Sequence, residues 1–296
     1  IQINDVCSDI GNYMNVRPVL CVGGSNIQDS KKLLEKGTTI VIGTPGRIID
    51  LLQRRYLSPQ LIKLLVLDEA DEMLSFSFLK QIRTIIESLS ESTQICLFSA
   101  TMPPSVVDLT RNFMTDPKMV LIKQEEISLE GISQYYINVQ KDKWKLDTFC
   151  DIYDLVSISQ SIVYVNSKSR AEELKDCLED KNFAVSVIHS KMSPAERSQV
   201  MKDFRHGNTR ILVSTDLLSR GIDIQQVSVV INYDLPHTNN KECYIHRIGR
   251  SGRFGRKGVA INFVTFNDFH KIRDLERFYS TKISEMPENI ADIIQC

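Results

Sequence analysis

The sequence predicts an α/β fold made of two tandem domains with parallel sheets. Short β-branched apolar runs alternate with amphipathic segments along the chain, and glycine or polar residues fill the turns between them. The length of 296 residues is sufficient for two domains of ordinary size. We expect domains at residues 1–123 and 134–296, joined by a polar linker at residues 124–133.

The short apolar runs give the expected strands. In the first domain we expect strands at residues 39–42, 64–67, 95–98 and 119–122, with helices at 48–55 and 106–113. In the second domain we expect strands at residues 161–165, 184–188, 210–213, 227–231 and 259–264. Ligands of open parallel sheets bind beyond the carboxyl ends of the strands, so the residues that follow each strand are the candidate site residues.

Composition restricts the class of protein. Hydrophobic residues make up 42% and charged residues 25% of the chain, as is typical of globular proteins. There is no apolar run long enough for a membrane span and no signal-peptide pattern. The seven cysteines form no Cys-x-x-Cys pair, which argues against a zinc site and favours reduced thiols. With a net charge of −1, nucleic-acid binding would depend on local basic groups and backbone donors.

Three carboxylates follow the apolar run that ends at Leu67, namely Asp68, Glu69 and Asp71. One interpretation is a solvated acidic helix start, which the helix dipole favours. The other is a metal-nucleotide site, in which Asp68 holds hydrated Mg²⁺ and Glu69 orients or deprotonates a water molecule. The order of strand and carboxylates favours the second interpretation.

Hydroxyl and glycine residues follow two neighbouring strands. Ser99 and Thr101 come after the strand that ends at Phe98, where they can bond the carboxylates or cap the helix expected near Pro103. The turn from Gly43 to Arg47 can hold a phosphate with its backbone N–H groups, although a plain strand-to-helix turn also explains it.

The second domain contains two polar segments of interest. Arginines recur every three residues at 247, 250, 253 and 256, with glycines between them that each cost about 1 kcal/mol in a helix relative to alanine. We therefore favour a loop that presents guanidinium groups to an anion over a solvated helical stripe. The segment 214–223 carries hydroxyl, cationic and carboxylate groups that can contact sugar and phosphate, or it is an ordinary surface loop.

Together these segments resemble the ordered motif set of the DEAD-box RNA helicases. The matching motifs are Thr44-Pro45-Gly46-Arg47, Asp68-Glu69-Ala70-Asp71, Ser99-Ala100-Thr101, Ser214-Thr215-Asp216, Arg220-Gly221-Ile222-Asp223 and the segment from His246 to Arg253. The resemblance covers essentially the whole chain and implies two RecA-like domains that couple ATP hydrolysis to sequence-independent RNA binding and local duplex unwinding. Stretches such as Tyr56-Leu57-Ser58-Pro59 are most similar to members that act in translation initiation, with the exon-junction and RNA-processing branch as the alternative.

The resemblance also implies a role for each matching residue. With ATP and Mg²⁺ as cofactors, the groups implied at the nucleotide are Asp68 (Mg²⁺, through water), Glu69 (attacking water), Asp223 (ribose), and Arg250 and Arg253 (arginine fingers). The residues implied to couple the nucleotide to conformational change are Asp71, Ser99, Thr101 and His246. The residues implied to contact the RNA backbone are Gly24, Thr44, Gly46, Arg47, Arg197, Thr215 and Arg220. The implied partners are RNA and a translation-initiation scaffold protein, for a monomer in the cytoplasm, or in the nucleus under the exon-junction alternative.

The chain departs from the family pattern at several positions. No Gly-x-x-x-x-Gly-Lys-Ser/Thr loop occurs, which we interpret as N-terminal truncation that leaves the first domain incomplete and this fragment inactive. An RNA-binding scaffold without ATPase activity and a DNA-directed helicase are the competing functions. The family's Gly-Asp pair is Ser190-Lys191 here, its glutamine is Pro194, and Phe76-Ser77 replaces an Arg-Gly pair. Ser193 to Glu196 nevertheless predicts a capped helix start.

Overall fold

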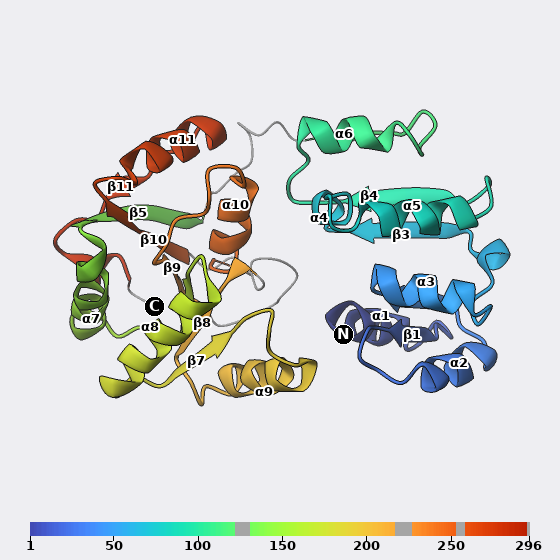
Figure 1. Cartoon of the computed structure of the whole chain (residues 1–296), viewed down its shortest axis with the longest axis horizontal. Helices are drawn as coiled ribbons and strands as arrows, with labels where there is room; N and C mark the ends of the chain where they lie inside the picture. The colour runs from blue at the N-terminus through green and yellow to red at the C-terminus, as the bar shows by residue number, and fades with distance from the viewer. Residues whose placement is uncertain (122–130, 217–226, 253–257, 295–296) are drawn as a thin grey trace. The chain divides into compact units, whose positions relative to one another are not determined.

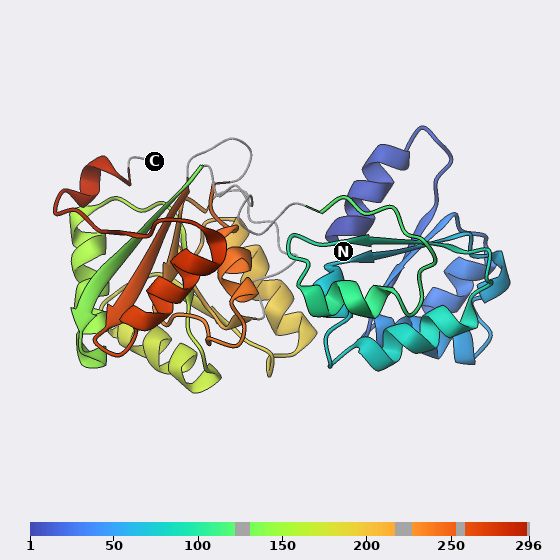
Figure 2. The same cartoon turned by 90° about the horizontal axis from the view of Figure 1, so that it is seen from above.

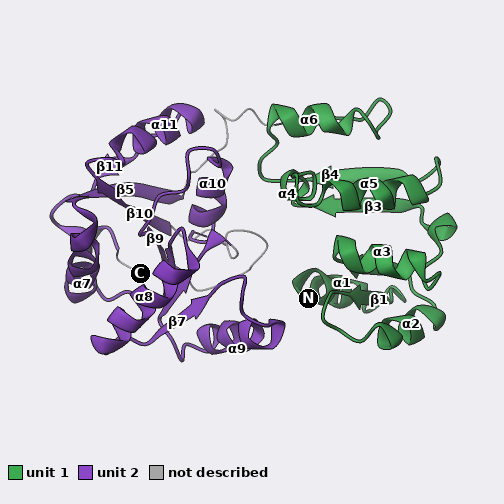
Figure 3. Ribbon diagram, viewed as in Figure 1, with its two compact units in different colours: residues 1–121 green, residues 122–296 purple. Residues whose placement is uncertain are grey.

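The computed structural model describes residues 1–121, 131–216, 227–252 and 258–294. The chain divides into two compact units, residues 1–121 and 122–296 (Figures 1 and 3). All strand pairs among the described residues are parallel, which confirms the predicted α/β class with parallel sheets. No helix in these ranges is long and apolar enough to cross a membrane.

Unit 1 alternates strands and helices along its whole length. Its elements are α1 (Gln2–Gly11), β1 (Pro18–Cys21), α2 (Ile27–Glu35), β2 (Ile40–Gly43), α3 (Pro45–Gln53), a 3-10 helix (Pro59–Leu61), β3 (Leu64–Asp68), α4 (Ala70–Met73), α5 (Leu79–Ser88), β4 (Gln94–Phe98) and α6 (Pro104–Thr110). The strands form two separate pairs, β1 with β2 and β3 with β4.

The core of unit 1 is divided in the same way. One cluster contains Leu67 and Ile82, the other contains Leu51, and Ile48 of α3 packs against both clusters. On the other side of the β3–β4 pair, Val66 is 50% exposed and Phe98 is 59% exposed. This face of the pair therefore presents an exposed apolar surface.

The predicted strand at 119–122 is wrong over its described residues, 119–121. These residues pair with no strand in the described part of the chain, and Val120 is 95% exposed. The run is apolar, but a strand also needs a neighbour to satisfy its backbone groups. Helix α1 and strand β1 are not among the elements expected from the sequence.

Unit 2 contains a larger sheet. Its elements are β5 (Ile132–Gln140), a 3-10 helix (Asp142–Trp144), α7 (Lys145–Leu155), β6 (Ser161–Tyr164), α8 (Lys168–Asp180), β7 (Val185–Ile188), α9 (Pro194–Arg205), β8 (Ile211–Ser214), β9 (Val229–Asn232), α10 (Glu242–Ile248), β10 (Gly258–Thr265), α11 (Phe269–Tyr279), β11 (Ser284–Glu285) and a 3-10 helix (Ile290–Asp292). The seven strands lie in the order β11-β5-β10-β9-β6-β8-β7. Strand β5 begins at Ile132, inside the segment 124–133 that we expected to be a linker, most of which lies outside the described residues.

Helices cover both faces of this sheet (Figure 2). Because successive strand residues point to opposite faces, Val163 of β6 packs with α7 and α8, whereas Ile162 packs with Phe204 of α9. Helices α10 and α11 pack against residues of β10 such as Ala260. Unit 2 therefore has the two-sided core of a parallel sheet, and the carboxyl ends of its strands meet at one edge.

Candidate functional site

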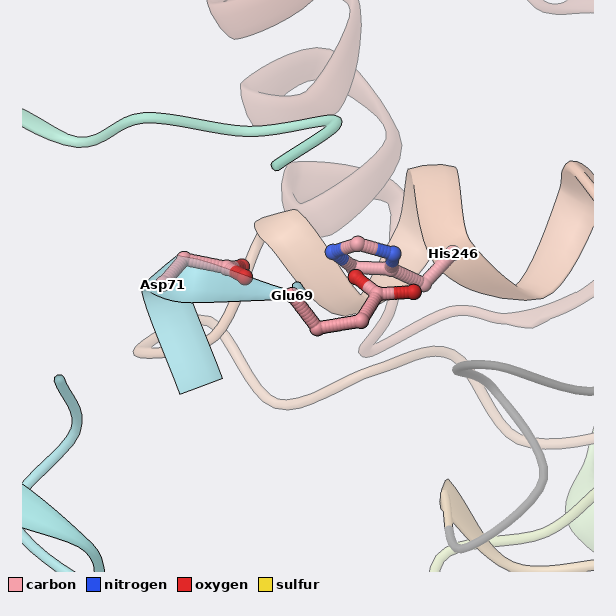
Figure 4. A group of neighbouring side chains, drawn as sticks. All are labelled: Glu69, Asp71 and His246. Carbon is pink, nitrogen blue, oxygen red and sulfur yellow. The ribbon is translucent and has the colours of Figure 1, made fainter. Parts of the chain in front are cut away.

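The predicted acidic site lies where β3 ends. Asp68 is the last residue of the strand, and Glu69 adopts a left-handed backbone conformation with a φ of 51° before α4 begins. The Glu69 amide donates a 2.9 Å hydrogen bond to Asp68 Oδ1. Figure 4 shows the side chains of Glu69 and Asp71 on this turn and that of His246 on α10. A left-handed conformation costs about 1–2 kcal/mol in a residue with a Cβ atom, and such strained residues often occur at functional sites.

Asp71 is tied to the neighbouring strand. Asp68 pairs with Phe98 in the parallel register, so the residues that follow Phe98 emerge next to the acidic turn. Ser99 Oγ donates to Asp71 Oδ1 at 2.8 Å, and Thr101 Oγ1 donates to Asp71 Oδ2 at 2.7 Å. The alternative of a hydroxyl cap on the next helix is wrong, because α6 has Pro103 at its N-cap and no side-chain cap.

Asp68 has the properties needed to hold a hydrated cation. Its side chain is exposed, and among the described residues its only hydrogen bond is the one that Oδ1 accepts from Glu69. The second oxygen, Oδ2, can therefore face a water of the Mg²⁺ shell, and Mg²⁺ prefers oxygen ligands and retains several waters. Asp71 differs, because its two oxygens accept hydrogen bonds from Ser99 and Thr101 and so hold it against the neighbouring segment.

The predicted RNA-contacting residues of unit 1 follow β1 and β2. These strands end together, with Cys21 paired to Gly43. Arg47 donates to Ser25 Oγ at 3.0 Å and to the Ser25 carbonyl at 2.7 Å, so it fixes the loop that contains Gly24. Gly24 has a φ of 82°, which a side chain would strain. The structure thus brings the Gly24 loop and the Arg47 turn together.

The same turn exposes backbone and hydroxyl groups. Thr44 and Gly46 are both exposed, and the Thr44 side chain makes no cap hydrogen bond at the start of α3. At Gly43, an added Cβ would lie 2.5 Å from Ile48 Cδ1 and 2.8 Å from the Cys21 carbonyl oxygen. The turn therefore requires glycine at position 43, whereas a Cβ added at Gly46 would meet only Gln81 Oε1, at an ordinary contact distance of 3.8 Å.

The segment after β8 is tied to α10. Asp216 Oδ1 accepts hydrogen bonds from Arg247 Nε at 2.6 Å and from Cys243 Sγ at 2.8 Å. Burial acts to raise the pKa of Asp216, but the charge and hydrogen bond of Arg247 and the hydrogen bond of Cys243 outweigh it and hold this pKa below its usual value. Thr215 lies between this anchor and the end of β8. Three predicted site residues, Arg220, Asp223 and Arg253, lie outside the described residues.

The expectation for the arginine-rich segment is partly wrong. Helix α10 ends at Ile248 with Gly249 as its C-cap, so the glycines do stop the helix as predicted. Arg247, however, lies within the helix and is 0% exposed, so it is not presented to an anion. Arg250 Nε donates to the His246 carbonyl at 3.1 Å. Sequence spacing indicated the basic character of the segment, but it carried no signal that one arginine points inward.

The departures in the loop after β7 leave the next helix intact. Ser193 and Glu196 form the predicted capping box of α9, with Pro194 at the first turn. Arg197 Nε donates to the Met192 carbonyl at 3.1 Å, which fixes the loop that carries the exposed Lys191. Phe76 is fully exposed, and nothing in the structure explains its replacement of the family's arginine.

Both halves of the chain match known families of domains. Residues 1–109 match the DEAD/DEAH box helicase domain, and residues 144–255 match the helicase conserved C-terminal domain. The chain is 52% identical, over 99% of its length and 74% of the relative's, to the ATP-dependent RNA helicase eIF4A of Pyricularia oryzae. It is also 52% identical, over 73% of the relative, to the ATP-dependent RNA helicase fal1 of Aspergillus oryzae.

The fold agrees with these similarities. The chain superimposes with a TM-score of 0.87 on S. cerevisiae Dbp5 bound to RNA and ADP BeF3, at 34% identity, covering 96% of this chain and 73% of that one. A TM-score of 0.85 relates it to Mss116p bound to ssRNA and AMP-PNP, at 26% identity, over 99% of this chain and 62% of that one.

Proposed function

Because this chain belongs to the DEAD-box family of ATP-dependent RNA helicases, we propose that it couples ATP hydrolysis to local RNA unwinding in translation initiation. Its two RecA-like domains and ATP dependence are those of the family. The observation that carries the proposal is the turn after β3, where Asp68 is exposed, Glu69 follows it directly, and Asp71 is held by Ser99 and Thr101.

In the proposed mechanism, residues of both units have separate roles at the nucleotide. Asp68 would hold Mg²⁺ through water, and the ion would supply positive charge that neutralises developing phosphate charge. Glu69 orients or deprotonates the attacking water. Arg250, together with Arg253, stabilises charge on the transferring phosphoryl group, and Asp223 contacts the ribose. Asp71, its two hydroxyl partners and His246 couple the state of the bound nucleotide to conformational change.

RNA is proposed to bind through its backbone. Gly24, Thr44, Gly46 and Arg47 supply contacts from unit 1, and Arg197, Thr215 and Arg220 supply contacts from unit 2. Such contacts recognise phosphates and 2′-hydroxyls and carry little sequence information. ATP and RNA favour the same conformational state, so each tightens the binding of the other by the same factor.

The pathway is proposed from similarity to eIF4A, supported by the stretch Tyr56-Leu57-Ser58-Pro59. We propose a cytoplasmic monomer that binds a translation-initiation scaffold protein. The equal identity to fal1 keeps the RNA-processing branch as the second candidate. Crosslinking of the protein to RNA in cells separates the two: enrichment on mRNA 5′ regions supports translation initiation, whereas enrichment near spliced junctions supports the second candidate.

The activity is tested with protein expressed from its complete reading frame. ATP hydrolysis should be stimulated by single-stranded RNA but not by DNA of the same sequence. Equal stimulation by DNA would support a DNA-directed helicase. RNA binding without any hydrolysis would support a scaffold without ATPase activity.

A further inference from the structure

Arg247 of α10 is a fully buried cation within unit 2. Its guanidinium donates hydrogen bonds to four acceptors: Asp216 Oδ1 at 2.6 Å, the Asp234 carbonyl at 2.7 Å, Asn166 Oδ1 at 3.0 Å and Asn232 Oδ1 at 3.2 Å. It also lies 5.1 Å from the centre of the Tyr164 ring. Every nitrogen of the guanidinium is thus used inside the unit.

The four acceptors come from the ends of three strands. Asn166 follows β6, Asp216 follows β8, and Asn232 ends β9 shortly before Asp234. One side chain therefore fixes α10 against three neighbouring strand ends at the same edge of the sheet. This edge is where the candidate site residues of unit 2 emerge.

Arg247 links two residues of different proposed function. Arg250 lies three residues further on, just beyond the C-cap of α10, where its Nε donates to the His246 carbonyl, and it is proposed to contact the nucleotide. Arg247 also holds the segment of Thr215 through its hydrogen bond to Asp216, and Thr215 is proposed to contact RNA. A buried ion pair is weak as a source of net stability, because desolvation offsets its attraction, but it can specify one arrangement of the groups around it.

We infer that Arg247 is a positioning residue that makes the Thr215 segment and helix α10, to whose last turn Arg250 is bonded, move as one body, so that RNA binding and nucleotide binding are coupled. This inference rests on the proposed function, which assigns RNA to Thr215 and nucleotide to Arg250. It differs from a purely structural role, because a structural role affects unfolding without changing how strongly the two ligands influence each other.

The test measures this coupling in protein expressed from its complete reading frame. The RNA dissociation constant is determined with and without a non-hydrolysable ATP analogue, and their ratio is the coupling factor. Arg247→Lys keeps the charge but loses the planar fork, and Asn166→Ala removes one acceptor. Both should lower the coupling factor about fivefold or more, while RNA affinity without nucleotide changes less than about twofold.

Asp142→Asn is the matched control. Asp142 accepts hydrogen bonds from Arg170 and pairs with Lys145 in the same part of unit 2, but it does not contact Arg247. Its coupling factor should equal that of the unchanged protein. If Arg247→Lys does not unfold cooperatively, Asn166→Ala decides the question.

The outcomes separate this inference from the proposed function. A coupling factor above one in the unchanged protein, retained in the folded variants, overturns the inference alone. A coupling factor of one in the unchanged protein overturns the proposed function, and the inference with it.

Discussion

Thr101 Oγ1 donates a 2.7 Å hydrogen bond to Asp71 Oδ2, and both residues are buried. The bond joins the turn after β3 to the segment after β4, so the acidic turn and the strand next to it are held in one arrangement. Ser99 occupies the second oxygen of the same carboxylate. Asp71 is thereby fixed from two positions of a single neighbouring segment.

Replacing Thr101 with valine keeps the shape of the side chain and removes the donor. A buried carboxylate left with one donor fewer should lower the free energy of unfolding by about 1–3 kcal/mol, as measured by urea denaturation. Thr110→Val is the control, because among the described residues the Thr110 hydroxyl bonds only a carbonyl of its own helix, that of Val107. Equal losses in the two variants would show that the hydrogen bond to Asp71 contributes no more to the free energy of unfolding than a bond to a helix carbonyl.

Glu69→Gln removes the proposed base while keeping the size of the side chain. RNA-stimulated turnover should fall about 100-fold or more, since general-base catalysis contributes about 10²–10⁴-fold, while nucleotide affinity persists. Glu91, exposed in the turn before β4, provides the control Glu91→Gln. Steady-state ATP hydrolysis measures the effect, and undiminished turnover in Glu69→Gln would remove Glu69 from the mechanism.

Arg250→Ala should affect hydrolysis far more than RNA binding. An arginine that stabilises a transferring phosphoryl group contributes about 10³-fold or more to the rate, so the hydrolysis rate should fall by that order. RNA affinity, measured by fluorescence anisotropy, should fall less than about tenfold. Arg205→Ala, at the exposed end of α9, should change neither quantity. Comparable losses in rate and affinity for Arg250→Ala would identify the segment as an RNA clamp.

The Asp216–Arg247 pair predicts an acid-dependent loss of stability. The pKa of Asp216 is lower in the folded protein than its ordinary value of about 3.9, so this carboxylate stabilises the fold above that pH. The contribution is lost as the pH falls through the folded-state pKa. Below about pH 5, the free energy of unfolding should therefore fall more steeply with falling pH in the unchanged protein than in Asp216→Asn. Parallel curves from denaturation at each pH would contradict the prediction.

The sequence predicts the strand-end residues better than it predicts their partners. Asp68 and Ser99 were expected at one sheet edge, because apolar runs indicate strands and parallel strands end together. The inward direction of Arg247 could not be predicted, because it depends on acceptors brought from β6, β8 and β9 by the fold. The false strand at 119–121 has the same cause, since apolar periodicity does not show whether a pairing neighbour exists.

The left-handed backbone conformation of Glu69 favours glycine, whereas the proposed chemistry at this position needs a carboxylate. Glycine at this position would relieve the strain of the turn, but it would remove the carboxylate proposed to act on water. Selection for thermostability alone would therefore favour Glu69→Gly, and under the proposed function that variant would be more stable but inactive in ATP hydrolysis. Under the proposed function, Glu69 therefore keeps the carboxylate that hydrolysis needs at the expense of backbone stability.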